Sequence, residues 1–488
     1  MEEKKNNEIL EIEQEKLGEE IEQKYSFITN LHPLSVVFVI IALVAGATYL
    51  IPGGAYDRVP ITIMGLDREM IIPGSFHYVD SIPQSFTRIW TSFMKGAVEA
   101  SDISFTILLC TGAFTAIIAT GAINNGIHSL AKRFGNKSIA LIPIFVFAFG
   151  LGGATYGMYE DAIPFIMVLC PLMLMMGYDS LVGVMTVHYA VVVGSSAAVL
   201  NPFSIGIAQA LAEIPMMSGS GVRVLVWFVM MVATSIYIMR YALKVKKDPS
   251  KSLTKEEDKI NRIKYNDFSM EGIEGLRKRD SIVLILTFLA MGIMIYGVIK
   301  REWWFNEIGS IFLFMGVIIS LIGGLKINEI IEKNLEGMTT VIAAVLLISA
   351  SRVITAMLTD SKVMDTILYF ISGALGELPK SIAVVIMAFV SGISMIFIQS
   401  SSGCAATLMP IMAPLGDIIG VPRQTICSAF AMFSFGWLVP WEGINYAMCR
   451  MANINFFVYL KKSIHFTAVV YLPLAILTLV LMTIFNYS

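Results

Sequence analysis

The longest uncharged stretch of the chain lies at residues 381–416 and reads SIAVVIMAFVSGISMIFIQSSSGCAATLMPIMAPLG. Two apolar arms flank a short polar segment, Gln399-Ser400-Ser401-Ser402-Gly403. About 20 consecutive apolar residues are enough for an α-helix to cross a bilayer. The stretch therefore predicts membrane-embedded helices that are interrupted at the serines.

The composition of the whole chain supports the same class. Of its 488 residues, 56% are hydrophobic and 15% are charged, whereas soluble domains carry about 25% charged residues. This difference argues against a soluble protein with many buried helices, and the net charge of −2 gives no indication of a nucleic-acid partner. Further stretches without Asp, Glu, Lys or Arg are 33–56, 103–131, 281–299 and 464–488. Because they are continuously apolar rather than alternating, they predict helical spans and exclude a transmembrane β-barrel.

We therefore predict an all-α polytopic membrane protein embedded in the lipid bilayer, with about nine spans and two helix–break–helix hairpins. The spans are expected at about 33–52, 103–122, 180–213, 222–243, 280–299, 307–325, 338–358, 422–447 and 464–486. The hairpins are expected at 138–177 and 381–419, and both are interpreted as re-entrant.

The charges between the spans predict the orientation of the chain. The loop 244–279 contains eleven Lys or Arg residues, and short cationic loops stay in the cytoplasm. Counting from this loop places the N-terminus in the cytoplasm and the C-terminus outside, in a cell (inner or plasma) membrane. The segment 83–98 is expected to lie at the interface, because Ile89, Trp90 and Phe93 share one helical stripe.

An internal repeat divides the chain. Lys137-Ser138-Ile139-Ala140 recurs as Lys380-Ser381-Ile382-Ala383, at the start of each hairpin. One span between the two copies would invert the second, and an inverted repeat is the architecture in which carrier sites form near the membrane midplane. The predicted regions are a cytosolic polar tail at 1–31, a first repeat at 32–243 with hairpin 138–177, a basic loop and connecting span at 244–306, and a second repeat at 307–488 with hairpin 381–419.

Each repeat contains two interruptions. The first hairpin breaks at residues 152–161 and the second at 399–403, and later spans break at Asn201-Pro202 and Pro440-Trp441-Glu442. Non-helical backbone is tolerated at membrane depth only where protein buries it or where it lines a wet cavity. We expect the breaks to face one another around a site. The alternative is that their glycines and serines only allow close helix packing.

Ionisable side chains inside a membrane are costly and usually mark a pathway. Glu160 and Glu442 lie at breaks, and Arg352 lies within a span, where it either pairs with one of them or binds a carboxylate of the substrate. His188 is interpreted as a hydrogen-bonded packing residue rather than a proton relay. The candidate substrate-binding residues are Tyr156, Gly157, Glu160, Asp161, Asn201, Pro202, Arg352, Gln399, Ser400, Ser401, Ser402, Gly403, Trp441, Glu442 and Asn445. The candidate Na⁺ ligands among them are Asn201, Ser400 and Ser402.

Motifs of enzymes are missing from the sequence. It contains no His-Glu-x-x-His, no Gly-x-Ser-x-Gly and no Walker A sequence. The five cysteines fall in apolar stretches and are interpreted as buried small hydrophobes rather than disulfide partners or metal ligands. We expect no enzymatic activity and no cofactor. Na⁺ or H⁺ is the candidate coupling ion.

The same residues resemble a known family. Tyr49-Leu50-Ile51-Pro52-Gly53-Gly54, Gly153-Ala154-Thr155-Tyr156-Gly157-Met158, Asn201-Pro202-Phe203 and Gln399-Ser400-Ser401-Ser402-Gly403 look like the YfcC-like carriers over about 32–486. The YfcC-like carriers are assigned as basic amino acid antiporters. They are grouped with the C4-dicarboxylate anaerobic carriers in the ion transporter superfamily. The resemblance implies that the hairpin tips and the Asn-Pro break line the substrate site, with Na⁺ or H⁺ coupling or exchange. Tyr159 and the segment 436–443 depart from the family pattern by adding bulk or charge.

These observations predict a secondary active transporter, symporter or antiporter, of a small charged organic solute. Two acidic groups at opposed breaks favour a solute that carries an amine, and an aromatic neighbour can add cation–π contact with it. An amino acid is therefore favoured, basic ones first, and a C4-dicarboxylate or other carboxylate is the alternative. A channel or a non-transporting membrane sensor is the alternative from another class. The sequence leaves homo-oligomerisation open.

Overall fold

The computed structural model describes residues 33–488 except 64–65, 73, 156, 265–275, 302, 304, 374–377, 399, 434 and 441. The predicted tail at 1–31 lies outside the described residues. Most of the described chain is helical, and eight helices are long and apolar enough to cross a membrane. The prediction of a polytopic helical membrane protein is confirmed.

The first half of the chain holds one of the two helix–break–helix hairpins. Its helices are α3 Pro33–Leu50, α4 Phe86–Glu99, α5 Ser101–Ala119, α6 Ala122–Phe134, α7 Leu141–Thr155, η2 Glu160–Phe165, α8 Ile166–Met175, α9 Ser180–Ala197, η3 Pro202–Gly206, α10 Ile207–Leu211, α11 Ser220–Lys247 and α12 Glu257–Lys264. The hairpin predicted at 138–177 corresponds to α7, η2 and α8. The span predicted at 180–213 is divided into α9, η3 and α10 by the Asn-Pro break.

The second half follows a similar plan. Its helices are α13 Lys278–Arg301, α14 Phe305–Ile322, α15 Ile327–Asp360, α16 Met364–Gly373, α17 Lys380–Phe397, α18 Ser401–Ile418, α19 Arg423–Met432, η6 Gly436–Leu438, α20 Gly443–Met451, α21 Phe456–Phe466, η7 Thr467–Tyr471 and α22 Leu472–Ile484. Two predicted spans were too short, because 338–358 belongs to the longer α15 and 464–486 to a helical run that begins at Phe456. The inverted relation of the two repeats stays a prediction.

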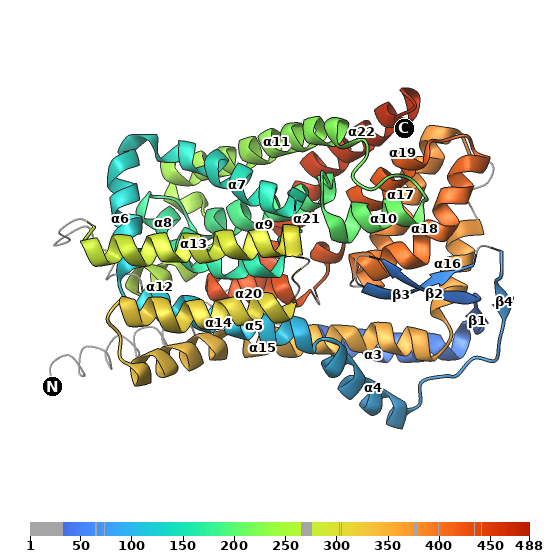
Figure 1. Cartoon of the computed structure of the whole chain (residues 1–488), viewed down its shortest axis with the longest axis horizontal. Helices are drawn as coiled ribbons and strands as arrows, with labels where there is room; N and C mark the ends of the chain where they lie inside the picture. The colour runs from blue at the N-terminus through green and yellow to red at the C-terminus, as the bar shows by residue number, and fades with distance from the viewer. Residues whose placement is uncertain are drawn as a thin grey trace.

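Two small antiparallel sheets between α3 and α4 were not predicted. β1 Gly54–Ala55 pairs with β4 His77–Tyr78, and β2 Arg58–Ile63 pairs with β3 Leu66–Ile71. The β2 segment, RVPITI, is rich in β-branched residues, which favour strands. The sheets pack beside α16 and α18 at one end of the molecule (Figure 1).

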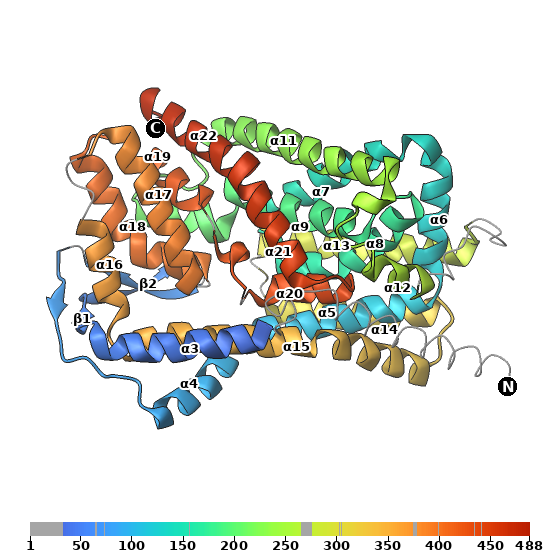
Figure 2. The ribbon, with the colours of Figure 1, turned by 180° about the vertical axis from the view of Figure 1, so that it is seen from behind.

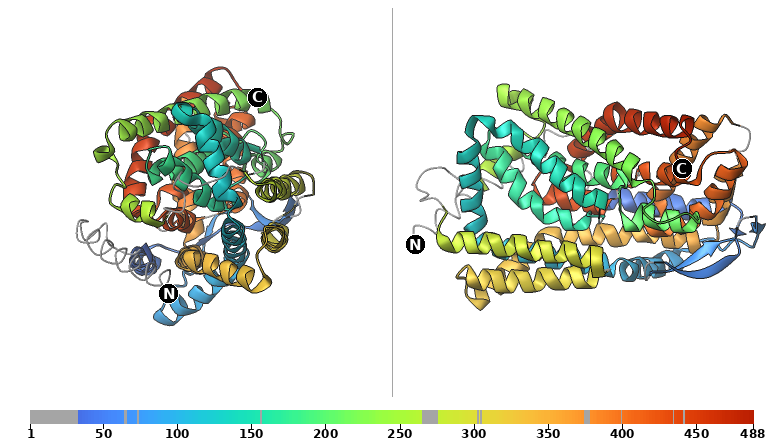
Figure 3. Two further views of the ribbon diagram at one scale, coloured as in Figure 1. Left: turned by 90° about the vertical axis from the view of Figure 1, so that its left-hand side faces the viewer. Right: turned by 45° about the horizontal axis from the view of Figure 1, so that its top comes forward.

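The long helices run along the longest axis of the molecule. Viewed from one end, many of them are seen nearly end-on (Figure 3). α9 lies at the centre of the molecule, since 94% of its span is buried, against 33% for α11. Figure 2 shows α20 near the middle of the molecule, with α21 and α22 leading from it to the C-terminus.

The predicted interfacial helix is α4, but a different stripe of it is exposed. Phe86, Trp90, Met94 and Val98 are between 62% and 74% exposed, whereas the opposite face packs on α15. Gly96 allows this contact, because a Cβ atom there would lie 2.8 Å from a backbone oxygen of α15. Of the stripe named from the sequence, Trp90 lies on the exposed face and Ile89 and Phe93 are half-buried, and the position at the membrane interface stays a prediction.

Candidate substrate cavity

A cavity of about 260 Å³ lies where the interrupted segments of the two repeats meet. Its walls come from the first hairpin tip, the broken end of α9, the tip of the second hairpin and the break before α20, with further residues from α5, α14 and α15. Pockets for drug-sized ligands measure roughly 300–1,000 Å³. The cavity therefore suits a small metabolite.

The first tip needs glycine at position 157. Gly157 has φ +80°, a left-handed conformation that glycine adopts without strain. A Cβ atom there would also lie 3.0 Å from Asn201 Oδ1 and from the ring of Phe203. The tip can therefore approach the Asn-Pro break closely only because this residue has no side chain.

Asn201 joins the first tip to the broken end of α9. Its amide nitrogen donates to Gly153 O at 3.3 Å and to Ser195 Oγ at 3.0 Å, and its amide oxygen accepts from Phe203 N at 3.0 Å. The backbone N–H of Leu200 donates to Ala154 O at 2.8 Å. Both segments lack regular helical hydrogen bonds here, and these contacts replace them.

Ser400 forms the N-cap of α18 at the second tip. Its hydroxyl accepts a hydrogen bond from Gly403 N at 3.2 Å and lies 3.2 Å from Ser402 Oγ. Serine is favoured at this position because its side chain satisfies an N–H group that the helix leaves open. Ser401, between them, is exposed and lines the cavity.

Glu442 begins α20 on the other side of the cavity. Its carboxylate accepts from Ile444 N at 3.2 Å and so caps the helix. Gly443 follows, and a Cβ atom there would lie 2.3 Å from the side chain of Ile348 on α15. This close packing sets the Glu442 carboxylate beside Arg352, one turn further along α15.

The cavity contains more negative than positive side chains. Glu160, Asp161, Glu442 and Arg352 all line it. The carboxylates of Glu442, Glu99 and Glu160 lie near enough to act on the Arg352 guanidinium electrostatically. Among the described residues no carboxylate lies within ion-pair distance of the Arg352 guanidinium, and its Nε has no hydrogen-bond partner. The charged groups are therefore available to a bound solute.

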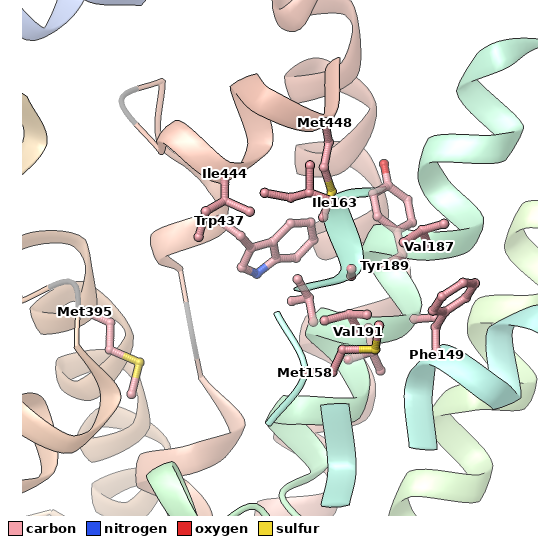
Figure 4. Packing of buried hydrophobic residues seen from close by; sticks show 14 of the residues in the cluster. Phe149, Met158, Ile163, Val187, Tyr189, Val191, Met395, Trp437, Ile444 and Met448 are labelled. Atoms are coloured by element: carbon pink, nitrogen blue, oxygen red, sulfur yellow. The ribbon is translucent and has the colours of Figure 1, made fainter. Parts of the chain in front are cut away.

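Trp437 forms an apolar wall between the repeats. Figure 4 shows its indole ring between Ile444 of α20 and Ile163 of η2, with Met158 of the first tip below it. The ring is 1% exposed, and its Nε1 has no partner in the described part of the chain. A buried donor of this kind in a cavity wall can bind an acceptor on a ligand.

The structure brings many of the predicted site residues to this cavity. The predicted residues that line it are Gly157, Glu160, Asp161, Asn201, Arg352, Ser400, Ser401, Ser402 and Glu442. Gly403 and Asn445 lie outside its lining, and Asn445 is fully buried with its amide donating to Trp437 O at 2.6 Å. The side chain of Pro202 lies outside the part of the chain that the structure describes. Tyr156, Gln399 and Trp441 lie outside the described residues. For all of the candidate substrate-binding residues, contact with the solute stays a prediction.

Several lining residues were not predicted. Ser195 and Ser196 precede the Asn-Pro break, and Tyr159 and Trp437 lie in two of the other breaks. The available signal for these two aromatic residues was that both lie where the sequence departs from the family pattern by adding bulk or charge. His188 is fully buried and its Nδ1 is hydrogen-bonded to the Tyr459 hydroxyl, as expected of a packing residue, and the choice of packing over a proton relay stays a prediction.

Comparison with known proteins gives relatives over nearly the whole chain. The family model described as DcuC, C4-dicarboxylate anaerobic carrier, matches residues 32–485. The protein named "Putative basic amino acid antiporter YfcC" of Escherichia coli strain K12 is 32% identical over 432 residues, 81% of this chain and 85% of that relative. An uncharacterized protein of Haemophilus influenzae is 28% identical over 463 residues, 86% of this chain and 91% of that relative.

Two solved structures are similar at low sequence identity. MtrF of Neisseria gonorrhoeae, described with a class of antimetabolite efflux pumps, aligns with a TM-score of 0.45 and 13% identity over 93% of this chain and 95% of that chain. The YdaH transporter of Alcanivorax borkumensis aligns with a TM-score of 0.44 and 13% identity over 94% of this chain and 100% of that chain.

Proposed function

This chain belongs to the C4-dicarboxylate anaerobic carrier family of transporters, and we propose that the solute it carries is an amino acid, with basic amino acids favoured. It is a carrier rather than an enzyme. We infer secondary active transport, by symport or antiport, with the solute bound in the cavity between the two tips and the two interrupted spans.

The charge of the cavity carries the proposal. Three carboxylates and one guanidinium line a cavity between the interrupted helices. Ionic groups in such a site are costly unless a partner of opposite charge is bound. An ammonium group between Glu160 and Glu442, together with a carboxylate on Arg352, would pair charges of both signs. A second ammonium or a guanidinium on the solute would offset the remaining negative charge.

The relatives offer support for two solute classes. The name of the Escherichia coli relative favours basic amino acids. The family description and Arg352, whose Nε has no partner among the described residues, favour a C4-dicarboxylate as the alternative. That alternative requires the carboxylates around the solute to be protonated or bound elsewhere, because like charges repel at short range.

Counterflow in proteoliposomes tests the class of transport and the solute together. Purified protein is reconstituted with unlabelled arginine, ornithine, succinate or fumarate inside, and uptake of labelled solute is measured. A carrier shows uptake stimulated by its internal solute, and a channel does not. Preference for succinate or fumarate over every amino acid would show that the assigned solute is wrong.

One conservative variant in the cavity, with a matched control, distinguishes an amino acid from a dicarboxylate as the solute. Glu442→Gln keeps an oxygen that can cap α20 but removes the charge, so arginine uptake should fall by roughly a hundredfold when one desolvated ion pair of about 3 kcal/mol is lost. Dicarboxylate uptake, where present, should stay roughly unchanged. Glu336→Gln is the matched control, because Glu336 is exposed and paired with Lys333 away from the cavity. A Glu442→Gln variant that transports arginine as fast as the parent would contradict the proposal.

A further inference from the structure

The broken end of α9 leaves backbone carbonyls that no helical turn satisfies. α9 ends at Ala198, a non-glycine residue in the left-handed conformation with φ 48°. Arg223 of α11 donates from Nε to Ala198 O at 2.9 Å and from Nη2 to Val199 O at 3.1 Å. A guanidinium thus occupies the carboxyl end of an interrupted helix, where the helix dipole is negative.

Arg223 is an unusual cation in this fold. It is 0% exposed, and within the described residues no carboxylate lies within ion-pair distance of it. Its Nη1 donates to Ser218 O at 2.8 Å and to the hydroxyl of Tyr487 at 3.0 Å. Four neutral acceptors therefore hold a buried charge, which the rigid donor fork of arginine allows and a lysine ammonium would match less well.

The guanidinium lies directly behind the cavity wall. Ser195, Ser196 and Asn201 line the cavity on either side of the carbonyls that Arg223 holds. In carriers built on interrupted helices, unwound carbonyls and helix carboxyl ends can coordinate Na⁺. Here the same groups already contact a positive charge that belongs to the chain.

We propose that Arg223 is the fixed cation of this interrupted span and that transport requires no Na⁺. This inference rests on the chain being a carrier and is independent of whether the solute is an amino acid. Arg223 is a positioning residue, since it holds the backbone of the break and does not line the cavity. Its charge takes the place that a coupling cation would fill.

Backbone contacts at the other interruptions support the proposal. Gly152 O and Ala154 O accept from backbone N–H groups at the first tip, and Ile398 O does so at the second. Beyond α19, Met432 O accepts from the hydroxyl of Tyr471, and Trp437 O accepts from the amide of Asn445. Each interruption therefore has at least one carbonyl, among the described residues, that is paired within the chain.

The candidate Na⁺ ligands from the sequence are engaged as well. Asn201 Oδ1 accepts from Phe203 N, and Ser400 Oγ accepts from Gly403 N. The proposal therefore assigns these side chains to the support of the breaks instead of to a bound Na⁺.

Na⁺ binding can be measured without knowing the solute. Thermal unfolding of the purified parent is compared in NaCl and in choline chloride at equal ionic strength, because an ion that binds the folded state raises the unfolding temperature. We expect equal unfolding temperatures for the parent and for Arg240→Met, a control on the exposed face of α11. A higher temperature in NaCl for the parent would overturn the proposal.

Variants of Arg223 test whether its charge is what makes Na⁺ unnecessary. Arg223→Met removes the charge and leaves the carbonyls of Ala198 and Val199 open, so Na⁺ should now raise its unfolding temperature and its uptake rate over those in choline. Arg223→Lys keeps the charge and should stay indifferent to Na⁺, which gives a second variant if the first does not fold. If folded Arg223→Met does not respond to Na⁺, the proposed role of Arg223 is wrong. If uptake by the parent depends on Na⁺, the proposal of Na⁺-free transport is wrong. Failure to transport amino acids would affect neither result.

Discussion

The interrupted span α9–α10 and the interrupted span α19–α20 satisfy their free backbone groups with side chains of different character. At the first break, a buried guanidinium and the amide of Asn201 hold the backbone. At the second, the hydroxyl of Tyr471 and the amide of Asn445 do so, and Glu442 caps the next helix. The shared helix–break–helix plan thus carries a fixed positive charge behind the cavity on one side and a carboxylate in the cavity on the other.

The two breaks also differ in which groups hold the backbone and which groups line the cavity. The first break is held from behind by Arg223 and contributes Ser195, Ser196 and Asn201 to the cavity lining, whereas the second contributes Glu442 and Trp437. A repeat in the sequence therefore predicts where the backbone is interrupted, because glycine, proline and asparagine decide that locally. It does not predict which break contacts the solute. The following experiments test the two sides of this comparison, from the largest expected effect to the smallest.

The largest expected difference between the two sides is the loss of stability when a closely packed glycine is replaced by alanine. In Gly153→Ala, the new Cβ would lie 2.4 Å from Val191 O and 2.9 Å from Ser195 N, and neither backbone atom can move without shifting α9. We expect a loss of ~3 kcal/mol or more in stability, seen as aggregation or a large fall in unfolding temperature. Gly392→Ala in α17 meets chiefly the ring of Phe435, which can turn, so its loss should be smaller. Gly46→Ala has open space and serves as control; a Gly153→Ala variant as stable as this control would contradict the comparison.

The starts of α9 and α19 should respond differently to pH. Burial, and next the neighbouring Asp258, raises the pKa of Asp179 to about 6. The folded protein then binds this proton more tightly than the unfolded chain, so the contribution to stability is full below the unfolded pKa of about 4 and is lost as pH rises through about 6. Thermal unfolding followed from pH 4 to pH 7 in steps of about one unit should show a fall on the order of 2 kcal/mol.

Asp179→Asn is the matching variant, because asparagine still caps a helix but does not titrate in this range. It should remove most of that slope and keep the cap that Asp179 provides to Val182 N at 3.0 Å. The start of α19 has no matching carboxylate, because its N-cap residue is Pro422, which does not titrate. An unchanged slope in Asp179→Asn would assign the pH dependence to another group.

The two tryptophans near the breaks should differ in their effect on affinity. Trp437→Phe removes an unpartnered N–H group from the cavity wall, so a solute with a carboxylate should bind about fivefold to tenfold more weakly if it accepts that hydrogen bond, worth about 1 kcal/mol. Trp227→Phe removes a donor that already binds Gly150 O at 3.0 Å away from the cavity, and should change stability but not affinity. Titration of purified protein by calorimetry distinguishes these results, and equal affinities for parent and Trp437→Phe would exclude this contact.

The exposed ion pairs at the start of α19 should matter least. Arg423 pairs with Asp417 at 2.8 Å and with Glu213 at 3.0 Å, but both carboxylates are largely open to solvent. Surface pairs are worth about 0–1 kcal/mol. Arg423→Ala should therefore lower stability by about 1 kcal/mol or less and leave transport intact, as measured by thermal unfolding and uptake. A loss as large as that of Gly153→Ala would mean that this pair also holds the break.

Much of the fold was predictable because its signals are local. The predicted span 280–299 lies within α13, and 307–325 agrees with α14 to within a few residues at its end. The interruptions at Asn201 and at the serines of the second tip were also anticipated, since these residues disfavour a continuous helix. The family assigned from the tip motifs is confirmed by the match over residues 32–485.

The missed features depend on residues far apart in the chain. Arg223 follows the start of an apolar helix, where a cation ordinarily extends to the interface, and nothing nearby indicates its partners. Those partners, Ala198 and Tyr487, lie 25 and 264 residues away along the chain. The indole nitrogen of Trp437, which has no partner among the described residues, was equally unpredictable, because whether a donor is satisfied depends on its neighbours in space.

By itself the sequence determined that the chain crosses a membrane repeatedly and breaks its helices at matched places, because helix length, apolar content and backbone preference are properties of short segments. Only the tertiary structure decided that Glu160, Glu442 and Arg352 share one cavity while Arg223 stays behind it. The physical reason is that the energy of a buried charge is set by the groups that surround it in three dimensions, and helices from both halves of the chain supply those groups.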